Sequence, residues 1–458
     1  MTEPHVRPFA YAPAPEASVV PALRERYQLF VGGEWTPSDD GATYADDNPA
    51  NEDVLAEVAL AAAEDVDRAV RAARRGFEKY WRKTRPAERA KYGFRLARLL
   101  HEHTRELAYL ESVDAGIPIR HASERDVPEA EAQLFYHAGW ADKLEWAVRA
   151  HERIRPVGVV AAMVAGESPL ASAAARIGPA LACGNAVVLK PGGSTPLSSL
   201  ALAELCTEAD LPPGVVNVVT GGAATGAALA AHADVDCIAF QGTTDLGKAI
   251  RRDAAGSRKR TALELIGKPA FVLFEDAPLD DAVEAILAGP GARIYAAESI
   301  ASEVERALVE RLASLACIDP LDGNAEVAPL HSREDCERIL ALVAEDERAG
   351  ARVIRACAPP PSGYWFPPTL VANVLPTYRT AFDDVSGPPY ALETFRVPRE
   401  AIERVNARSC GRAASVWTVS GALAAHAARQ LRPGTVWCNG PQRSEPPLPA
   451  GLLTYLHV

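Results

Sequence analysis

Residues suited to binding a charged ligand stand at the ends of apolar runs in the middle of the chain. Lys190 ends the run AVVLK, Gly222 follows VVNVVTG, and Gly242 and Thr243 end the run CIAFQGT. Backbone N–H groups at the start of a helix, together with the Thr243 hydroxyl, would bind a pyrophosphate at the positive end of the helix dipole. A lysine that ends a buried strand would project into the same crevice. These residue types predict a phosphate-containing ligand.

Two of these features also have a plainer explanation. A turn from a strand into a helix needs Gly242 whether or not a ligand binds, and Lys190 could be an ordinary solvated lysine. For Lys190 we favour the ligand-facing interpretation, because a charged residue at the end of a buried strand lies where such sheets bind ligands. For Gly242 and Thr243 both interpretations stay open.

The elements that position these residues alternate between strand and helix. Apolar runs at 157–165, 186–191, 215–221 and 237–242 are separated by helical patterns. Four β-α repeats in close succession predict a parallel, doubly wound sheet, whose ligands bind at the carboxyl ends of the strands. A second α/β region extends from about residue 267 to residue 440. The sequence therefore predicts an α/β fold.

Length and charge restrict the class of protein. The 458 residues are too many for one ordinary core, so two or three domains are expected. The formal net charge is −12, and no concentrated basic face supports nucleic-acid binding. The longest apolar stretch is too short to span a membrane, and the proline-rich residues 1–21 lack the apolar core of a secretory signal. We expect a cytoplasmic protein.

The eight cysteines show neither CxxC nor mixed Cys/His spacing, so no metal site is predicted. Most stand among apolar residues, which favours reduced, buried thiols over disulfides. Cys438, in GTVWCN, is on a predicted strand of the second domain and could lie near the cleft as a reactive thiol. The preferred interpretation is a small, buried apolar residue.

Several segments resemble, in order, signature segments of the aldehyde dehydrogenase superfamily, and together they cover nearly the whole chain. They are LFVGGEW, NPANEDVLAEV, EDVDRAVRAARRGFEKYW, RPVGVVAAMVAGESPL, GNAVVLKP, LPPGVVNVV, IAFQGTTDLGKAI, LELIGKPAFVLFEDAPLDDAVE, DDVSGPP, AASVWT and GTVWCN. The resemblance implies a doubly wound cofactor-binding domain, a second α/β domain and a reduced oligomerisation hairpin. The implied boundaries are 1–25 for an extended arm, 26–142 with 156–266 for the Rossmann-like domain, 267–442 for the catalytic-type domain, and 143–155 with 443–458 for the oligomerisation element.

The resemblance implies NAD or NADP as cofactor, with binding weakened or lost. Lys190 matches the lysine that holds the adenosine ribose, and Thr243 replaces a serine but keeps the hydroxyl. Gly193 stands where the family usually has a carboxylate for the ribose 2′-hydroxyl, which would either admit a 2′-phosphate or mean that no nucleotide binds. The family's ribose-binding glutamate is shortened to Asp384, and the phenylalanine of that motif is Ser386.

The catalytic groups implied by the resemblance are largely missing. Glu264 matches the general base, but the following family glycine is Ile266, so Glu264 could be retained only by the fold. The nucleophilic cysteine should stand between Glu264 and Arg293, where this chain has none and is shorter than the family. Ser299 and Ser302 lie beyond this stretch and should face solvent. Glu167 occupies the place of the oxyanion asparagine, where a carboxylate would repel the developing negative charge.

Three functional hypotheses follow. The preferred one is a catalytically inactive aldehyde dehydrogenase homologue, a pseudoenzyme, that acts as a partner or scaffold for an active aldehyde dehydrogenase. The second is an active NAD(P)-dependent dehydrogenase with an atypical site, suggested by the retained Lys190, Thr243 and Glu264. The third is a nucleotide sensor without turnover. The expected partner is another aldehyde dehydrogenase chain or a second copy of this chain, and no nucleic acid or membrane is expected.

Overall fold

The computed structural model describes most of the chain in two compact units. The described residues are 21–148, 154–289, 291–375, 377–382, 387–408, 413–440, 452 and 454–457. Within them, unit 1 comprises Leu265–Ile318 and Ala325–Ser444, and unit 2 comprises the residues up to Glu264, Asp319–Asn324 and Glu445–Val458. Asp384, Ser386 and most of the predicted amino-terminal arm lie outside the described residues.

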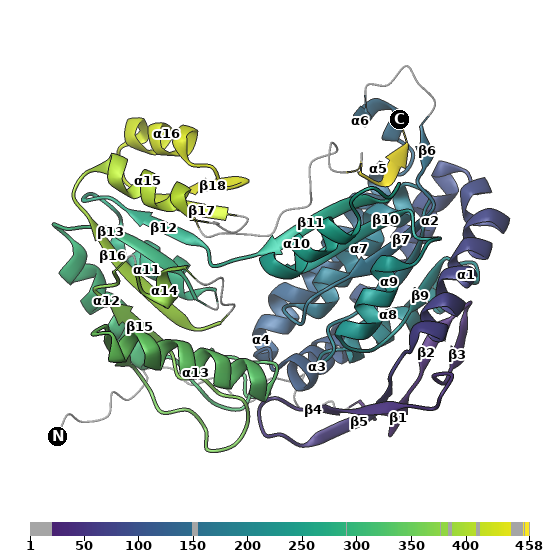
Figure 1. Ribbon diagram of the computed structural model, residues 1–458, viewed down its shortest axis with the longest axis horizontal. Coiled ribbons are helices and arrows are strands. Elements are labelled where there is room, and N and C mark those ends of the chain that lie inside the picture. Colours follow the sequence, from purple (N-terminus) through teal and green to yellow (C-terminus); the bar gives the residue numbers. More distant parts are fainter. Residues whose placement is uncertain are drawn as a thin grey trace. The chain divides into compact units, whose positions relative to one another are not determined.

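Unit 2 is built on a seven-stranded sheet in the order β11-β10-β7-β8-β9-β2-β3 (Figure 1). Its four central strands are parallel. They are β10 (Cys237–Thr243), β7 (Val159–Met163), β8 (Ala186–Lys190) and β9 (Val216–Val218). β11 (Arg260–Ile266) forms one edge, and the hairpin of β2 (Leu29–Val31) and β3 (Glu34–Thr36) forms the other. The predicted doubly wound parallel sheet is confirmed.

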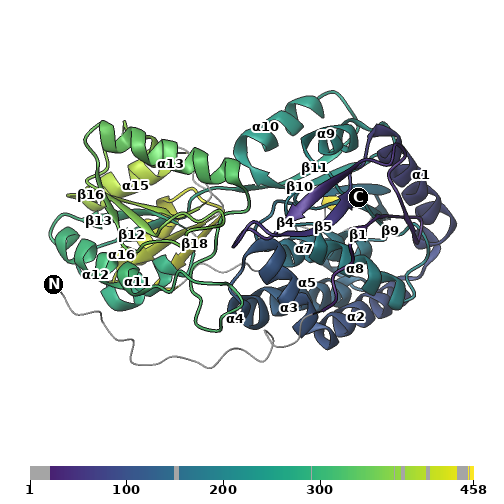
Figure 2. The same cartoon turned by 90° about the horizontal axis from the view of Figure 1, so that it is seen from below.

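Helices cover both faces of this sheet (Figure 2). One face carries α7 (Pro169–Ala182) and α8 (Leu197–Glu208), and the other carries α1 (Ala63–Lys79) and α9 (Ala223–Ala231). The chain passes from β7 to β8 and β9 in one direction and then returns to β10 on the other side of β7. The strand order therefore reverses between β7 and β10, which is the position where sheets of this type bind ligands.

Local sequence explains why these elements begin and end where they do. β7 and β8 are continuous apolar runs, as expected of parallel strands that are buried on both faces. α7 has Pro169 in its first turn, where the missing N–H costs nothing. The helix ends before Gly184, whose φ of +88° is the left-handed conformation that commonly closes a helix. Pro169 and Gly184 thus mark the two ends of α7. The start of α7 also marks the end of the loop that follows β7.

The remaining elements of unit 2 surround this core. α2, α3 and α5 pack together and against α7 or α8, and a small sheet has the order β1-β5-β4. Their bounds are α2 Pro86–Glu102, α3 Thr104–Ala115, α4 Ile119–His121, a π-helix Ala122–Asp126, α5 Val127–Trp140, α6 Leu144–Val148, α10 Thr244–Asp253, a 3-10 turn Trp81–Lys83, β1 Arg26–Tyr27, β4 Thr43–Asp47 and β5 Val54–Ala59.

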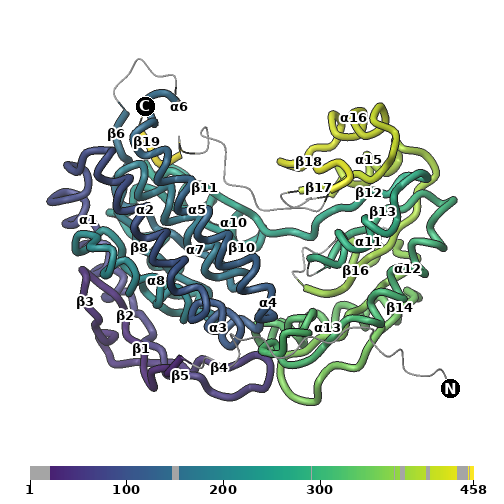
Figure 3. The backbone as a smooth tube through the Cα atoms, turned by 180° about the vertical axis from the view of Figure 1, so that it is seen from behind, coloured from purple at the N-terminus to yellow at the C-terminus, as the bar shows by residue number. Residues whose placement is uncertain are grey.

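The carboxy-terminal segment belongs to unit 2 although its sequence follows that of unit 1. Its strand β19 (Leu456–His457) pairs antiparallel with β6 (Arg155–Pro156) (Figure 3). The Asn185 Nδ2 donates to the Tyr455 carbonyl at 2.9 Å, and the Asn185 Oδ1 accepts from the N–H of Gly158 at 2.9 Å. One buried amide therefore links the tail to the entrance of β7.

Unit 1 contains a second doubly wound sheet, in the order β14-β15-β16-β13-β12-β17-β18. Only the edge pair β14–β15 is antiparallel. The strands are β12 Ala270–Leu273, β13 Arg293–Ala297, β14 Arg352–Arg355, β15 Thr369–Ala372, β16 Pro389–Phe395, β17 Ala413–Trp417 and β18 Thr435–Cys438. The helices are α11 Leu279–Leu287, α12 Ala301–Ser314, α13 Arg333–Arg348, α14 Arg379–Phe382, α15 Pro398–Ala407 and α16 Gly421–Gln430.

Alternate residues of the unit 1 strands pack on opposite faces, as a period of two requires. Phe271 and Leu273 of β12 join the apolar cluster that contains α11 and α12. Ala270 and Val272 join the cluster that contains α15 and α16. Both faces of the sheet are thus covered, as in unit 2.

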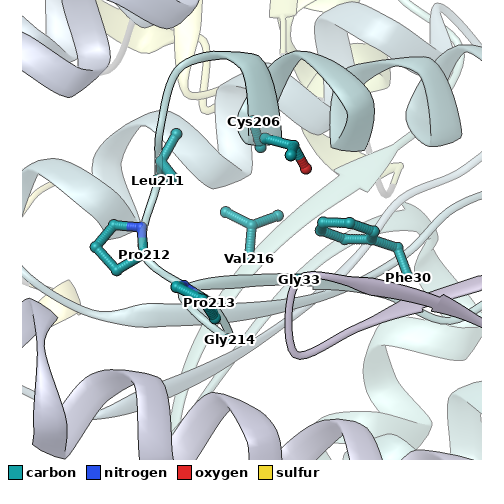
Figure 4. A pocket seen from close by; sticks show the side chains of 9 residues that line it. Phe30, Gly33, Cys206, Leu211, Pro212, Pro213, Gly214 and Val216 are labelled. Carbon is teal, nitrogen blue, oxygen red and sulfur yellow. The ribbon is translucent and has the colours of Figure 1, made fainter.

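A small apolar pocket lies at the amino end of β9, on the edge of the sheet opposite to the carboxyl ends of the parallel strands (Figure 4). Its lining residues are Phe30, Gly33, Cys206, Thr207, Leu211, Pro212, Pro213, Gly214 and Val216. Apart from a threonine and a buried thiol it offers no polar side chain. The residues predicted to bind a charged ligand lie instead at the carboxyl ends of the parallel strands.

Three further observations concern the described residues. None of their helices is long and apolar enough to cross a membrane. They contain no group of three or more His, Cys, Asp and Glu side chains that could hold a metal ion. Seven of the eight cysteines are described, all as free thiols, and only Cys183, Cys206 and Cys237 are buried. The prediction that most thiols are buried is wrong, because positions in loops, in an edge strand and on a half-exposed face of α13 leave the other four described thiols partly or fully exposed.

Candidate active site

The candidate ligand site of unit 2 lies at the carboxyl ends of β7, β8 and β10. Met163 of β7 is in register with Lys190 on one side and with Phe240 on the other. The loop after β7 contains Glu167, and β10 leads into Gly242 and Thr243. The structure therefore brings the predicted residues to one edge of the sheet, at the point where the strand order reverses.

Lys190 is mostly enclosed at this edge. Its Nζ donates to the Pro191 carbonyl at 2.9 Å, and its Cδ lies 3.8 Å from the position that a Cβ on Gly226 would occupy, at the start of α9. Burial lowers the pKa of Lys190 to about 8. No ion pair of the described residues includes Lys190. A buried ammonium without a carboxylate favours an anionic ligand, because such a ligand would restore the charged form.

Gly193 and Gly222 form the open side of the same edge. A Cβ on Gly193 would lie 3.5 Å from the Gly221 carbonyl oxygen, which is an ordinary contact, and a Cβ on Gly222 would meet nothing within 4 Å. Steric crowding therefore does not require a glycine at position 193. A Cβ would fit there with ordinary contacts, and the role of Gly193 in cofactor binding stays a prediction.

Gly242 and Thr243 form the turn from β10 into α10. Thr243 is the N-cap residue of α10, and its hydroxyl makes no capping hydrogen bond. The side chain of Thr243 is exposed. A Cβ on Gly242 would lie 2.5 Å from the Cζ atom of Phe240, so packing alone accounts for this glycine. The strand-to-helix turn is confirmed, and a cofactor contact at Gly242 and Thr243 stays a prediction.

Glu167 lies in the turn between β7 and α7. Its carbonyl accepts from the Ser172 hydroxyl at 3.1 Å, and the next residue, Ser168, has a φ of +44°. This left-handed conformation is uncommon for serine and is fixed by a 3.2 Å hydrogen bond from its Oγ to Asp126. The Glu167 side chain is half-buried and, when ionised, offers only acceptors. It supplies no donor for an oxyanion.

Glu264 is paired with a residue that sequence analysis missed. The Nη2 of Arg176, on α7, donates to the Oε2 of Glu264, on β11. The side chains are only 11% and 26% exposed, respectively. A carboxylate held by a permanently charged guanidinium is poorly suited to accept a proton from water. The signal that could have revealed Arg176 is its position as the only charged residue in the helical segment SPLASAAARIGPALA.

The turn that should carry a nucleophile belongs to unit 1 and joins α11 to β13. Residues 288–292 are Ala, Gly, Pro, Gly and Ala, so none carries a nucleophilic side chain. The Tyr390 hydroxyl donates to the Gly289 carbonyl at 2.9 Å, and the N–H of Ala391 donates to the Ala292 carbonyl at 2.9 Å. A Cβ on Gly291 would lie 2.2 Å from the Gly387 carbonyl oxygen. The described residues on either side of Pro290 are therefore held by contacts with residues 387–391.

The structure also shows the surroundings of other residues of unit 1 that were considered from the sequence. Cys438 is exposed at the end of β18, so the interpretation of a buried apolar residue is wrong; the strand is at the edge of its sheet and leaves the thiol uncovered. Ser299 and Ser302 are exposed, as predicted. Ile266 ends β11 and is half-buried. The predicted cofactor residue Asp384 lies outside the described residues.

Comparisons with known proteins identify relatives along nearly the whole chain. A model described as "Aldehyde dehydrogenase family" matches residues 35–451. A putative aldehyde dehydrogenase, DhaS, of Bacillus subtilis is 37% identical over 437 residues, which cover 91% of this chain and 88% of the relative. Human aldehyde dehydrogenase 1A1 is 35% identical over 436 residues, which cover 90% of this chain and 87% of the relative.

Solved structures with the same fold include complexes with NAD+. The NAD+ complex of an aldehyde dehydrogenase from Bacillus cereus is 34% identical, with a TM-score of 0.88 and coverage of 95% of this chain and 92% of the other. Betaine aldehyde dehydrogenase of Staphylococcus aureus, also solved with NAD+, is 29% identical, with a TM-score of 0.88 and coverage of 94% and 93%.

Proposed function

Because this chain belongs to the aldehyde dehydrogenase family, we propose that it is a catalytically inactive member that serves as a partner or scaffold for an active aldehyde dehydrogenase. The observation that carries the proposal is the turn at residues 288–292, which has no nucleophilic side chain. Aldehyde oxidation in this family begins with the attack of a thiolate on the carbonyl carbon. Without a thiol in this turn, that covalent step has no nucleophile.

The electrostatics of unit 2 support the same conclusion. Glu167 stands where a hydrogen-bond donor is needed to stabilise an oxyanion, and losing one such donor costs about a hundred- to a thousandfold in rate. Glu264, the position of the general base, is engaged by Arg176. The nucleophile and the oxyanion donor are thus absent, and the base is held in an ion pair.

The residues of unit 2 fit the adenosine end of NAD or NADP. Lys190 would contact the ribose, the open space beside Gly193 would accept the ribose 2′ substituent, and the N–H groups after Gly222 and Thr243 would face the phosphates. The cofactor would supply the hydride acceptor when bound. Because Gly193 offers no carboxylate to the 2′-hydroxyl, we propose that NAD binds more weakly than in active relatives and that a 2′-phosphate is tolerated.

The partner surface that we propose includes the sheet of β6 and β19. Trp146, on the neighbouring α6, has 85% of its surface exposed. An exposed tryptophan beside a short edge strand is suited to an interface, because such a side chain buries a large apolar area in one contact. We propose that an active aldehyde dehydrogenase chain covers this surface, in the cytoplasm, and that a second copy of this chain is the alternative partner.

Two alternative functions rest on retained residues. Lys190 and Glu264 would support an active dehydrogenase with an atypical site. Lys190, together with Gly193 and Gly222, would support a nucleotide sensor without turnover. The three functions differ in two measurable properties, namely turnover and binding.

Three measurements test the proposal. The formation of NADH and NADPH across a panel of aldehydes should stay at the background rate, and turnover with any aldehyde would establish the active enzyme instead. Co-expression with the active aldehyde dehydrogenases of the same organism should yield a complex that survives gel filtration and is lost on Trp146→Ala. Calorimetric titration with NAD and NADP then identifies the sensor: binding without turnover and without a complex would overturn the partner role.

A further inference from the structure

Two thiols of unit 1 are in contact outside the candidate site. Cys317 follows α12, and Cys357 follows β14, the edge strand of the unit 1 sheet. Their side chains interact with each other. Both cysteines are partly exposed, so small solutes can reach them. Neither residue belongs to the motifs that indicate the family.

The backbone on both sides of this pair is fixed. Leu315, two residues before Cys317, and Ala356, next to Cys357, pack against the same apolar cluster. The N–H of Ala316 donates to the Glu326 Oε2 at 3.0 Å, and the N–H of Ala356 donates to the Pro368 carbonyl at 3.1 Å. The two thiols therefore meet because of the packing around them.

We propose that Cys317 and Cys357 form a redox-sensitive dithiol that hydroperoxides convert into an intrachain disulfide. One thiolate attacks a peroxide oxygen, the O–O bond breaks, and a sulfenic acid and an alcohol or water are formed. The second thiol then attacks the sulfenic sulfur; the S–S bond forms, the S–O bond breaks, and water leaves. The two thiols lose two electrons in total, and the peroxide gains them.

Either cysteine can begin this sequence. A thiol that holds its proton is the weaker nucleophile, so the thiol that is deprotonated first attacks the peroxide and the other resolves the sulfenic acid. The disulfide would join the segment after α12 to the end of β14 and enclose α13 in a covalent loop. This property is independent of the proposed function.

The test uses the full-length protein. After treatment with hydrogen peroxide, the protein is denatured, its free thiols are alkylated, and its peptides are identified by mass spectrometry. We expect two of the eight thiols to become protected, one crosslinked peptide pair containing Cys317 and Cys357, and complete reversal by dithiothreitol. Oxidised protein should also unfold at a higher temperature than reduced protein.

Variants separate this pair from the other exposed thiols. Cys317→Ser and Cys357→Ser should each abolish the reversible loss of two thiols. Cys336→Ser is the matched control, since this partly exposed thiol of the same unit bonds instead to the Trp365 carbonyl at 3.4 Å and should leave the crosslink intact. Eight alkylated thiols after oxidation of the unmodified sequence, or a crosslink that survives Cys317→Ser, would overturn the proposal.

Discussion

Arg176 and Glu264 form a largely buried ion pair between α7 and β11 of unit 2. Removing one partner of such a pair leaves a charge with little access to water. We expect Glu264→Gln to lower the free energy of unfolding by about 3 kcal/mol, because the Arg176 guanidinium loses its counter-charge. Urea denaturation at neutral pH measures this change.

The ion-pair prediction has two controls. Arg176→Met combined with Glu264→Gln should recover part of the loss, since no unpaired charge stays buried. Glu88→Gln removes a carboxylate from an exposed pair with Lys91 in the same unit and should not change stability measurably. If Glu264→Gln is as stable as the starting protein, the pair does not contribute as the geometry indicates.

Stability should fall as pH rises, because unit 2 buries carboxyl groups that are protonated when folded. Burial and the nearby Asp126 carboxylate raise the pKa of Glu111 from 4.5 to about 8. The folded chain then keeps a proton that the unfolded chain has already lost. The contribution of Glu111 is therefore fully present below pH 4.5 and is lost as pH rises towards 8. Each pH unit in that window lowers stability by up to about 1.4 kcal/mol.

The Glu111 prediction is checked by repeating denaturation across this range of pH. Glu111→Gln keeps an oxygen that can accept from the N–H of Leu170, as the Glu111 Oε1 does at 3.2 Å, but it cannot ionise. The variant should be more stable than the starting protein at pH 8 and nearly equal to it below pH 4.5. Glu102→Gln, at an exposed position of the preceding helix, should not alter the pH dependence. Parallel curves for all three proteins would contradict the assignment.

Nucleotide affinity should depend on the charge of Lys190. Lys190→Met should weaken NADP binding by about ten- to a hundredfold, which corresponds to the loss of one hydrogen bond to a charged group. Because the pKa of Lys190 is about 8, binding to the starting protein should weaken as pH rises above that value. Isothermal titration calorimetry measures both effects without requiring turnover.

Gly193 offers the complementary variant. A Cβ at this position makes only ordinary contacts, so Gly193→Glu should fold, and its carboxylate should strengthen NAD binding relative to NADP. Equal affinities in Lys190→Met, Gly193→Glu and the starting protein would mean that nucleotides do not bind beside Lys190.

The turn between α11 and β13 should tolerate one substitution and reject another. Gly291 has a φ of +140° and lies against the Gly387 carbonyl oxygen, so Gly291→Ala combines backbone strain with a steric clash. We expect it to cost about 3 kcal/mol or more. Gly289→Ala is the matched control, because its Cβ would meet nothing within 4 Å. Thermal unfolding of the two variants should differ clearly, and similar melting temperatures would show that the turn adapts freely.

Much of the fold could be predicted because its strands are buried on both faces. The runs that became β7 and β8 are uninterrupted apolar segments, and glycines such as Gly184 mark helix ends. Local patterns therefore determine where the parallel strands lie. The family resemblance added the order of the site residues along the chain.

The features that escaped prediction depend on contacts between distant segments. The pairing of Arg176 with Glu264 joins residues 88 positions apart, and no local pattern indicates it. The exposure of Cys438 depends on its strand lying at the edge of a sheet, which strand patterns alone do not reveal. The contact of Cys317 with Cys357 likewise follows from tertiary packing.

The attachment of the carboxy-terminal segment has a consequence for biosynthesis. Asn185 binds the Tyr455 carbonyl and the N–H of Gly158, so unit 2 is completed by residues that the ribosome adds after the whole sequence of unit 1. A nascent chain that has already emerged up to Glu264 still has an unfilled binding position for β19 beside β6. Domains generally fold in the order of their synthesis. Here unit 2 is synthesised first but completed last. The unpaired edge of β6 therefore stays available to other chains during translation.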